Sequence, residues 1–362
     1  MLWLVKDSRD RSFIAELHDL AWKHVATHFH PPTRQWAGPH SRSYATDLRE
    51  QPAVLAFIQA ACGKSVELGC VEPLPLGLEA YRVPLQCPRK WARLFASLKE
   101  PKLVIETFVK ADDSKDGSRN PIIGTTWLHP RFSLGTVNRG DLWQQRRPIV
   151  AYWGSPSGPR FLRLRFMKDD ADFSSALSFS VQHEGSALVV VTLCVDHGDT
   201  HPSLDPIKDG KIKAARLGLR FEFGGALADC TMRTVGDGKK AIVIQDREVR
   251  FLLRPVASAF AGSGFKWEFP ELKLANHVDM VAYQGELKEH DMMALGDAFI
   301  CFTLEEWPYD QPQMPAGAME SQLAGGKFRG RWITSGKTLD IDAPVKPAGY
   351  SAMSDAFRSS VA

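Results

Sequence analysis

The sequence lacks the features that would assign it to a membrane or secreted class. No run of apolar residues is long enough to cross a bilayer, so we expect no membrane partner. The first residues, MLWLVKDSRD, contain no apolar stretch followed by a small-residue cleavage site, so no signal peptide is visible. The sequence starts partway into a helical region, and an upstream piece could carry a signal. The location of the protein therefore stays open.

The sequence also has little net charge and no closely spaced pair of cysteines. The 45 basic and 42 acidic residues leave a net charge of +3, which is too small to indicate a nucleic-acid partner. The 6 cysteines form no CxxC pair, so their spacing predicts no zinc site. In a domain of this size we expect scattered cysteines to be small buried hydrophobes, and a disulfide between two of them stays open.

Common catalytic signatures are absent as well. There is no GxSxG nucleophile elbow and no GxxxxGK[ST] or GxGxxG phosphate loop. His24 and His28 lie one helical turn apart, a spacing that can hold a metal, but no glutamate lies beside His24. A second cluster, more typical of a solvated turn, comprises Asp196, His197, Asp199 and His201. We therefore expect no metal and no cofactor.

Two helices are predicted near the N-terminus. Residues 11–29 form the first, which ends at the proline pair 31–32. Its predicted buried face comprises Phe13, Ile14, Leu17, Leu20, Ala21 and Val25. Residues 52–61 form the second, and its predicted buried face comprises Val54, Leu55, Phe57 and Ile58. Two helices make a poor core, so they either pack on the β region that follows or are the remnant of a larger helical domain.

The rest of the chain is predicted to be mainly β. Residues 161–167, FLRLRFM, place Leu162, Leu164 and Phe166 on one face and Arg163 and Arg165 on the other. About a dozen such strands without intervening helices indicate a large antiparallel β-sandwich, and the fold class is α+β, mainly β. The expected organisation is a helical segment over 1–62, a linker with a short helix over 63–100, the sandwich over 101–343 and a surface tail over 344–362.

Two loops rich in polar and aromatic side chains are the best places for a site. The first lies between the two predicted helices, around a turn at Gly38 and Pro39. The second interrupts residues 122–154, where a strand breaks at His129 and resumes at Pro148. A long loop inside a compact domain is usually functional or disordered, and aromatic residues argue against disorder. We therefore predict that these loops line a groove for a polar, ring-shaped ligand such as a sugar chain.

The residue types in the two loops suit removal of a proton next to a carboxylate. Arg, Asn or neutral His can stabilise the charge that develops, while Tyr or His moves the proton. The predicted catalytic residues are His40, Tyr44, His129 and Tyr152. The predicted substrate-binding residues are Trp36, Arg42, Asn138, Arg147 and Trp153. Structural roles stay open beside these: Arg42 could pair with Asp47, His40 could bond a backbone carbonyl, and Tyr152 and Trp153 could be core residues.

The order of elements carries a resemblance to a known superfamily. Helices that end in the loop AGPHSRSY at residues 37–44, then a linker and a large sandwich, resemble the C-terminal part of heparinase II/III-like and alginate-lyase-like polysaccharide lyases. The loop is also similar to a motif of uncharacterised bacterial and fungal proteins. The lyase resemblance implies an (α/α) toroid joined to a β-sandwich, with a cleft between them. It also implies β-elimination of uronic-acid polysaccharides by Tyr and His with a carboxylate-neutralising Asn, Arg or His.

This chain departs from the lyase pattern in two ways. A complete toroid has many more helices than the two or three predicted here, so the chain is a fragment, has a misassigned start, or belongs to a family that lost the toroid. No Asn-His pair on a toroid helix matches either, and the catalytic assignment stays open.

We therefore expect a carbohydrate-active protein, a polysaccharide lyase whose partner is a polysaccharide or oligosaccharide. The lyase hypothesis predicts that His40 or Tyr44 lies within reach of His129, Arg147 or Tyr152. A non-catalytic carbohydrate-binding or structural sandwich would instead expose a tryptophan platform, made of Trp127, Trp143, Trp153 and Trp267. A glycoside hydrolase would need two carboxylates across a cleft, for which Asp141 and Glu184 are the nominees. The sequence does not indicate an oligomeric state.

Overall fold

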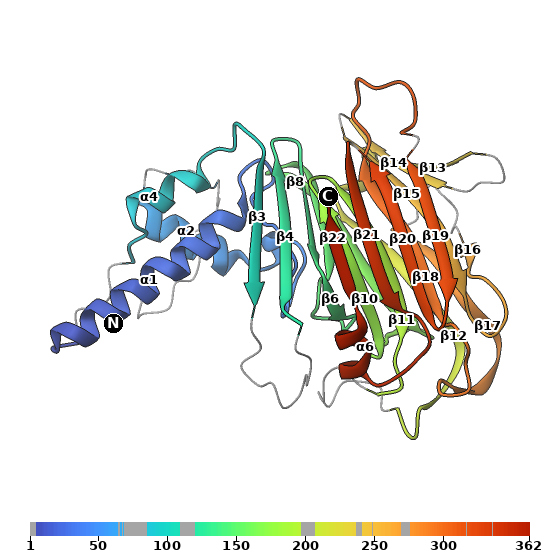
Figure 1. Cartoon of the computed structure of the whole chain (residues 1–362). Helices are drawn as coiled ribbons and strands as arrows, with labels where there is room; N and C mark the ends of the chain where they lie inside the picture. The colour runs from blue at the N-terminus through green and yellow to red at the C-terminus, as the bar shows by residue number, and fades with distance from the viewer. Residues whose placement is uncertain are drawn as a thin grey trace.

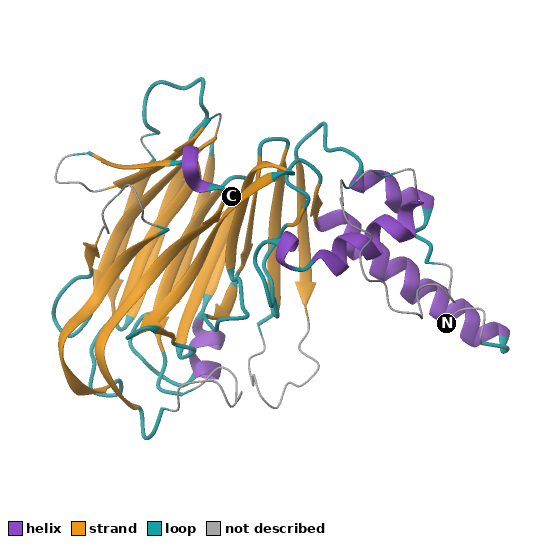
Figure 2. Cartoon of the chain, turned by 180° about the vertical axis from the view of Figure 1, so that it is seen from behind, coloured by secondary structure: helices purple, strands orange, loops and turns teal. Residues whose placement is uncertain are grey.

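A computed structural model describes most of the chain, namely residues 5–63, 66, 68, 85–108, 120–196, 207–236, 241–247, 249–268, 276–315, 317–334 and 336–362. The helices of the N-terminal part gather at one end of the molecule, beside strands β3 (Lys102–Phe108) and β4 (Ile122–His129), and most of the other strands form a stack of sheets (Figure 1). The view from behind places the helices at that same end (Figure 2). None of the described helices is long and apolar enough to span a bilayer.

The helical part is held by one small apolar core. Its elements are α1 (Ser8–His28), a short hairpin of β1 (Phe29–His30) and β2 (Gln35–Trp36), η2 (Leu48–Glu50), α2 (Pro52–Cys62), α4 (Arg89–Ala92) and η4 (Arg93–Phe95). The Asp7 side chain caps α1 by accepting from two backbone N–H groups, and Pro52 opens α2. Trp22 and Phe95 pack with Leu55 and Ile58 in this core. Both predicted helices are confirmed, as is the short helix predicted within the linker, which forms α4 and η4.

The buried face predicted for the first helix is wrong. Phe13, Leu17 and Leu20 are 60%, 49% and 58% exposed, whereas Trp22 and Ala26 are buried. The described parts of α2, α4 and the sheet edge pack against one side of the later turns of α1, which leaves Phe13, Leu17 and Leu20 largely exposed. On α2 the predicted Leu55 and Ile58 are buried, but Phe57 is 45% exposed.

Three antiparallel sheets form the β part, which confirms the mainly β fold class. The largest is nine-stranded, in the order β16-β17-β12-β8-β7-β5-β4-β3 with β9 paired to β8. Its strands are β3 (Lys102–Phe108), β4 (Ile122–His129), β5 (Phe132–Val137), β7 (Ile149–Ser155), β8 (Gly158–Lys168), β9 (Ala171–Asp172), β12 (Lys211–Gly225), β16 (Lys266–Glu268) and β17 (His277–Asp291). The alternation predicted for residues 161–167 is confirmed on β8, because Leu162, Leu164 and Phe166 are buried and the two arginines between them are not.

The other two sheets stack behind the first. The middle sheet has seven strands, in the order β13-β14-β15-β18-β11-β10-β6. They are β6 (Arg139–Asp141), β10 (Ala176–His183), β11 (Ser186–Leu193), β13 (Thr231–Val235), β14 (Ala241–Asp246), β15 (Val249–Ala259) and β18 (Phe299–Glu306), and η5 (Leu227–Asp229) precedes β13. The third sheet consists of β19 (Ala318–Ala324), β20 (Lys327–Thr334), β21 (Lys337–Pro344) and β22 (Arg358–Val361).

The middle sheet is buried on both faces. One face packs against the nine-stranded sheet in the largest core, where Val189 and Phe302 meet Leu164 and Phe221. The other face packs Val190 of β11 and its neighbours against the four-stranded sheet. This two-sided burial explains why all eight residues of β11 are buried and why that stretch of sequence is almost continuously apolar.

The C-terminal residues do not form the surface tail that we predicted. Helix α6 (Tyr350–Ala356) packs Tyr350 and Met353 into the second core, and Phe357 follows them. Strand β22 then pairs with β21, with Leu339 opposite Val361. A helix of two turns followed by a polar edge strand has too few residues to show a sequence period, which is why we missed it.

The stretch from His129 to Pro148 is also less of a loop than predicted. Strands β4 and β5 form a hairpin in which His129 pairs with Phe132. Strand β6 then crosses to the middle sheet, where Asp141 pairs with Leu177. Apart from the hairpin turn and Asn138, the part of this stretch outside the strands is residues 142–148.

Cysteines and the second acidic cluster can be placed in part. None of the five described cysteines forms a disulfide, and Cys194 and Cys301 are buried as expected. Asp196 accepts a hydrogen bond from the Tyr350 backbone N–H at 2.7 Å. The predicted residues His197, Asp199 and His201, and linker residues 69–84, lie outside the described residues.

Candidate functional site

The first polar-aromatic loop rests directly on the outer face of the nine-stranded sheet. Gly38 adopts a positive φ of 103°, which reverses the chain. A Cβ atom on Gly135 of β5 would lie 2.4 Å from the Gly38 Cα, and one on Gly124 of β4 would lie 3.4 Å from the Pro39 Cγ. The turn at Gly38 and Pro39 therefore packs on the sheet at Gly135 and Gly124, where the sheet has no side chains.

The two predicted loops are in contact. This confirms the prediction that His40 lies within reach of Arg147. The His40 N–H donates to the Arg147 carbonyl at 3.0 Å, and the Arg147 N–H donates to the His40 carbonyl at 2.8 Å. Three residues on, the Ser43 N–H donates to the Gln145 carbonyl at 2.7 Å. This short two-stranded contact fixes the first loop against the second.

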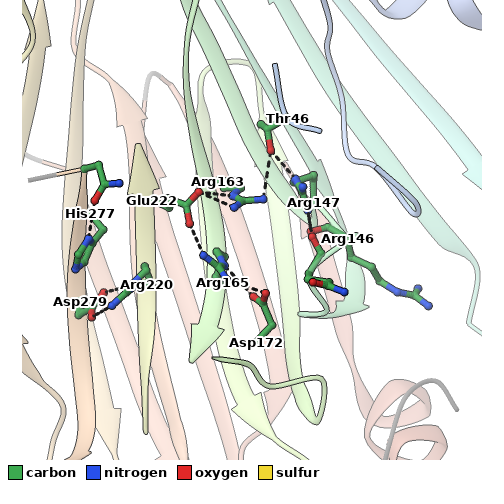
Figure 3. Close-up of polar contacts among 12 residues, drawn as sticks. Thr46, Arg146, Arg147, Arg163, Arg165, Asp172, Arg220, Glu222, His277 and Asp279 are labelled. Carbon is green, nitrogen blue, oxygen red and sulfur yellow. Dashed lines mark hydrogen bonds and ion pairs between the residues drawn. The ribbon is translucent and has the colours of Figure 1, made fainter. Parts of the chain in front are cut away.

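The buried side chain of Arg147 adds hydrogen bonds at this contact between the two loops, which we call the junction. Arg147 donates from Nε to the Thr46 hydroxyl at 2.9 Å, and its Nη1 donates to the carbonyls of Gln144 and Arg146 (Figure 3). Burial and the nearby Arg163 lower the pKa of Arg147 to about 10. The Tyr152 hydroxyl donates to the Thr46 carbonyl at 2.7 Å from the sheet below.

A cavity of about 470 Å³ lies between the helical part and the sheets. Its wall is built from the end of α1, the first loop, the start of α2, the edge strands β3 and β4, and the segment after β5. Its polar lining consists of His24, His28, His40, Ser41, Arg42, Ser43, Tyr44, Gln51, Glu106, Thr126, Arg139, Asp141, Arg146 and Tyr350. The volume lies within the range of small-molecule binding pockets.

Four of the nine predicted site residues line this cavity, and all four come from the first loop: Trp36, His40, Arg42 and Tyr44. Tyr44 is 73% exposed, and the Arg42 side chain is exposed with no ion pair to the described part of the chain. Asp47, considered as its partner, pairs with Arg49 at 2.6 Å instead. Arg42 and Tyr44 are thus available to a ligand.

His40 has a structural role as well as a place in the cavity wall. Its Nε2 donates to the Trp36 carbonyl at 2.9 Å, the alternative considered from the sequence. Desolvation, partly offset by this bond, lowers its pKa to about 4. A neutral ring that already donates its proton to the backbone is poorly suited to act as a catalytic acid.

The other five predicted residues do not line this cavity. Asn138 accepts from the Ile123 N–H at 2.9 Å and donates to the Pro121 carbonyl at 3.1 Å, which holds the edge of the sheet together. His129 lies on a separate cavity of about 650 Å³ that Glu184 and Glu306 also line. Its ring accepts from the Arg131 N–H at 3.2 Å, and burial lowers its pKa.

Tyr152, Trp153 and Arg147 are buried, at 1%, 1% and 2% exposure. Burial raises the pKa of Tyr152, and the Trp153 indole donates to Asp246 at 2.8 Å. Tyr152 and Trp153 are therefore core residues in the middle of β7, which confirms the structural alternative in which they belong to the core. The alternation of β7 is hidden because both of its faces are covered.

The described structure does not bring together the tryptophans predicted for a carbohydrate-binding sandwich or the two acids predicted for a glycoside hydrolase. A tryptophan platform would need exposed rings, yet Trp143 and Trp153 are buried and Trp127 and Trp267 pack partly against the main core. Asp141 and Glu184, the nominees for a glycoside hydrolase pair, line different cavities. Asp141 is also ion-paired with Arg146 at 2.7 Å.

The sequence did not predict the cluster of His24, His28 and Glu106. His24 Nδ1 lies 3.1 Å from Glu106 Oε1, and His28 Nε2 lies 3.3 Å from Glu106 Oε2. The ligand atoms of all three residues lie within 4.8 Å of one another. The histidine spacing was the visible signal. The helix carries no glutamate beside His24, and the fold brings Glu106 to the histidines from β3.

The outer face of the nine-stranded sheet carries two separate groups of paired arginines and carboxylates (Figure 3). Arg163 and Arg165 of β8 both bind Glu222 of β12, and Arg165 also binds Asp172 at 2.8 Å. Farther along, Arg220 and Arg216 share Asp279 of β17. Each of these guanidinium groups has a carboxylate partner, so the face offers no unpaired row of arginines to an anionic chain.

Comparisons with known proteins add no assignment. The chain matches no protein-family model and no curated protein. The function is therefore argued from the cavity itself.

Proposed function

We propose that this protein is a carbohydrate-active enzyme that cleaves an acidic polysaccharide by β-elimination in the cavity between the helical part and the nine-stranded sheet. The substrate class is a chain that contains uronic acids. The observation that carries the proposal is the position of Arg42 and Tyr44, two exposed side chains of one loop that line the same cavity as His24, His28 and Glu106.

These side chains supply the groups that elimination requires. The Arg42 guanidinium is a planar donor suited to a substrate carboxylate, and it stabilises the charge that develops there when the adjacent proton leaves. The Tyr44 oxygen removes that proton and its hydroxyl delivers one to the departing oxygen. The carbon–hydrogen and carbon–oxygen bonds break as a carbon–carbon double bond forms, and no water is added.

The remaining polar groups favour elimination over hydrolysis. A glycoside hydrolase needs one protonated and one ionised carboxyl group flanking the bond. The acids in the described cavity wall are Glu106 and Asp141, and both are engaged, the first by two histidines and the second by Arg146. Trp36, partly exposed beside His24 and His40, supplies a ring face for a sugar.

An absorbance assay for unsaturated uronate tests the proposal. The purified protein is incubated with a panel of polysaccharides that contain uronic acids, and the matched controls are the same polymers after reduction of their carboxyl groups. We expect absorbance to rise with at least one acidic polymer and not with its reduced form. Binding without new chain ends across the whole panel would instead favour a carbohydrate-binding protein.

A further inference from the structure

We propose that His24, His28 and Glu106 bind a divalent transition-metal ion of the zinc class in the wall of the cavity. Two imidazoles and one carboxylate are ligands that zinc commonly takes in proteins. Binding of the ion does not depend on the proposed elimination, because it rests on the geometry of these three side chains.

Two of the three ligand pairs have the spacing of a tetrahedral site, and all three ligand atoms lie within 4.8 Å of one another. Ligands at the roughly 2.0–2.1 Å typical of zinc lie about 3.3 Å from one another in a tetrahedron. The two observed separations, 3.1 Å from His24 Nδ1 to Glu106 Oε1 and 3.3 Å from His28 Nε2 to Glu106 Oε2, are close to that edge. The side chains have therefore approached to metal-site distances from two elements, α1 and β3.

A backbone bond orients one ligand correctly. His28 Nδ1 lies 2.9 Å from the His24 carbonyl, which can only accept, so Nδ1 carries the proton. In the neutral ring the lone pair is then on Nε2, which is the atom that faces Glu106. Metal-binding histidines are commonly fixed in this way, through donation of the other ring nitrogen to a carbonyl.

The Glu106 carboxylate also has an oxygen atom whose surroundings suit a bound cation. Glu106 Oε2 is buried and has no hydrogen-bond partner among the described residues, although His28 Nε2 lies 3.3 Å away. With the neutral His28 ring, two lone pairs would face each other across that gap, which is unfavourable because the Glu106 Oε2 atom itself is buried. A cation between them satisfies both atoms.

The site leaves the ion accessible from the cavity. Three protein ligands leave at least one coordination position to water or substrate, the arrangement typical of catalytic rather than structural zinc. All three side chains line the cavity, and the His24 side chain is 40% exposed. If the proposed elimination holds, the ion acts with Arg42 on the substrate carboxylate; this added role rests on the proposed function.

Metal binding is tested with the full chain after removal of bound metal by a chelator. Zn²⁺ is titrated by calorimetry into the wild-type protein and the variants His24→Gln, His28→Gln, Glu106→Gln and Glu106→Asp. We expect one ion per chain in the wild type and at least about a tenfold loss of affinity in each Gln variant. Glu106→Asp keeps the ligand type and should lose less than Glu106→Gln. The matched control is His277→Gln, which alters a partly exposed histidine of β17 and should bind Zn²⁺ like the wild type.

Co²⁺ added to the metal-free wild type gives a second readout that needs no variant. Visible bands of tetrahedral Co²⁺ without sulfur-to-metal charge transfer support the site. Thiolate bands, no stoichiometric binding by the wild type, or equal affinity in the wild type and all four ligand variants would overturn it. If the ion binds but no polymer is cleaved, the proposed function fails while the metal site stands.

Discussion

Gly38 and Gly135 are in van der Waals contact through their backbones, in a space that no side chain could share. A Cβ atom on Gly135 would meet the Cα, C and N atoms of Gly38 at 2.4, 2.7 and 3.0 Å. The loop that carries Arg42 and Tyr44 is placed by this contact and by the reciprocal bonds between His40 and Arg147. The shape of the cavity therefore depends on two glycines that are 97 residues apart in the chain (135 − 38).

Gly135→Ala should lift the first loop from the sheet. The added methyl group meets backbone rather than a flexible side chain, so we expect a loss of about 1–3 kcal/mol in the free energy of unfolding. Catalytic activity should fall more than stability alone would explain. The matched control is Gly296→Ala, which has nothing within 4 Å of the new Cβ and a φ outside the positive range. Equal stability of the two variants would contradict the contact.

Tyr44→Phe and Tyr152→Phe separate the tyrosine that we propose as catalytic from the structural one. Each change removes one hydroxyl, but only Tyr44 faces the cavity. Tyr44→Phe should lower kcat by about a hundredfold or more with little change in Tm. Tyr152→Phe should lose the bond to the Thr46 carbonyl, cost about 1 kcal/mol of stability and keep most of the activity. The two variants are compared in steady-state kinetics and thermal melts, and the reverse order of kcat would refute these roles.

Arg147→Lys should loosen the junction of the two loops. The buried guanidinium joins the Thr46 hydroxyl to two carbonyls, which the single ammonium group of lysine cannot match in geometry. We expect a loss of about 1–3 kcal/mol in urea unfolding. Arg331→Lys, in an exposed pair with Asp340, is the control and should change stability by less than about 1 kcal/mol. Similar losses in both variants would show that the junction contributes little.

Acid should destabilise the protein partly through His30. This buried ring binds Thr33 at 2.7 Å and the His129 carbonyl at 2.8 Å, and desolvation lowers its pKa from 6.5 to about 4. Below the unfolded pKa the unfolded chain takes up a proton that the folded chain does not. Stability is therefore fully present above about pH 6.5 and falls as the pH drops toward about 4, by about 3 kcal/mol at most from this group.

The comparison of wild type with His30→Gln isolates that contribution. The variant should be less stable at neutral pH, because two internal bonds change, but its stability should fall less steeply between about pH 6.5 and about pH 4. The free energy of unfolding in urea is measured across that range. Parallel curves for the two proteins would show that His30 titrates alike in both states.

Local patterns predicted most of the fold. The alternation in β8 and the continuous apolar run of β11 each follow from which faces are covered, and both are visible in sequence. The face of α1 could not be predicted, because Phe13, Leu17 and Leu20 have the spacing of a buried stripe but are not covered by the part of the chain that the structure describes. Strand β22, with the polar sequence RSSV, is defined by its pairing partner rather than by its own residues.

The site was predictable in part for a similar reason. The first loop carries its exposed side chains in a short stretch around a Gly-Pro turn, so Trp36, Arg42 and Tyr44 could be selected directly. Glu106 could not, because it joins His24 across 82 residues and lies in a strand whose neighbours give no sign of a site. Tyr152 and His129 share the residue types of a catalytic pair, and only tertiary structure shows one in the core and the other on a different cavity.

The mass of the products tests the central claim most directly. Elimination redistributes the atoms of the polysaccharide without adding water, so the fragment masses should sum to that of the parent chain, with an unsaturated uronate at each new non-reducing end. Hydrolysis would add one water per bond broken. We predict water-free fragments from the wild type and none from Tyr44→Phe. Water-added fragments, or undiminished cleavage by Tyr44→Phe, would contradict the account.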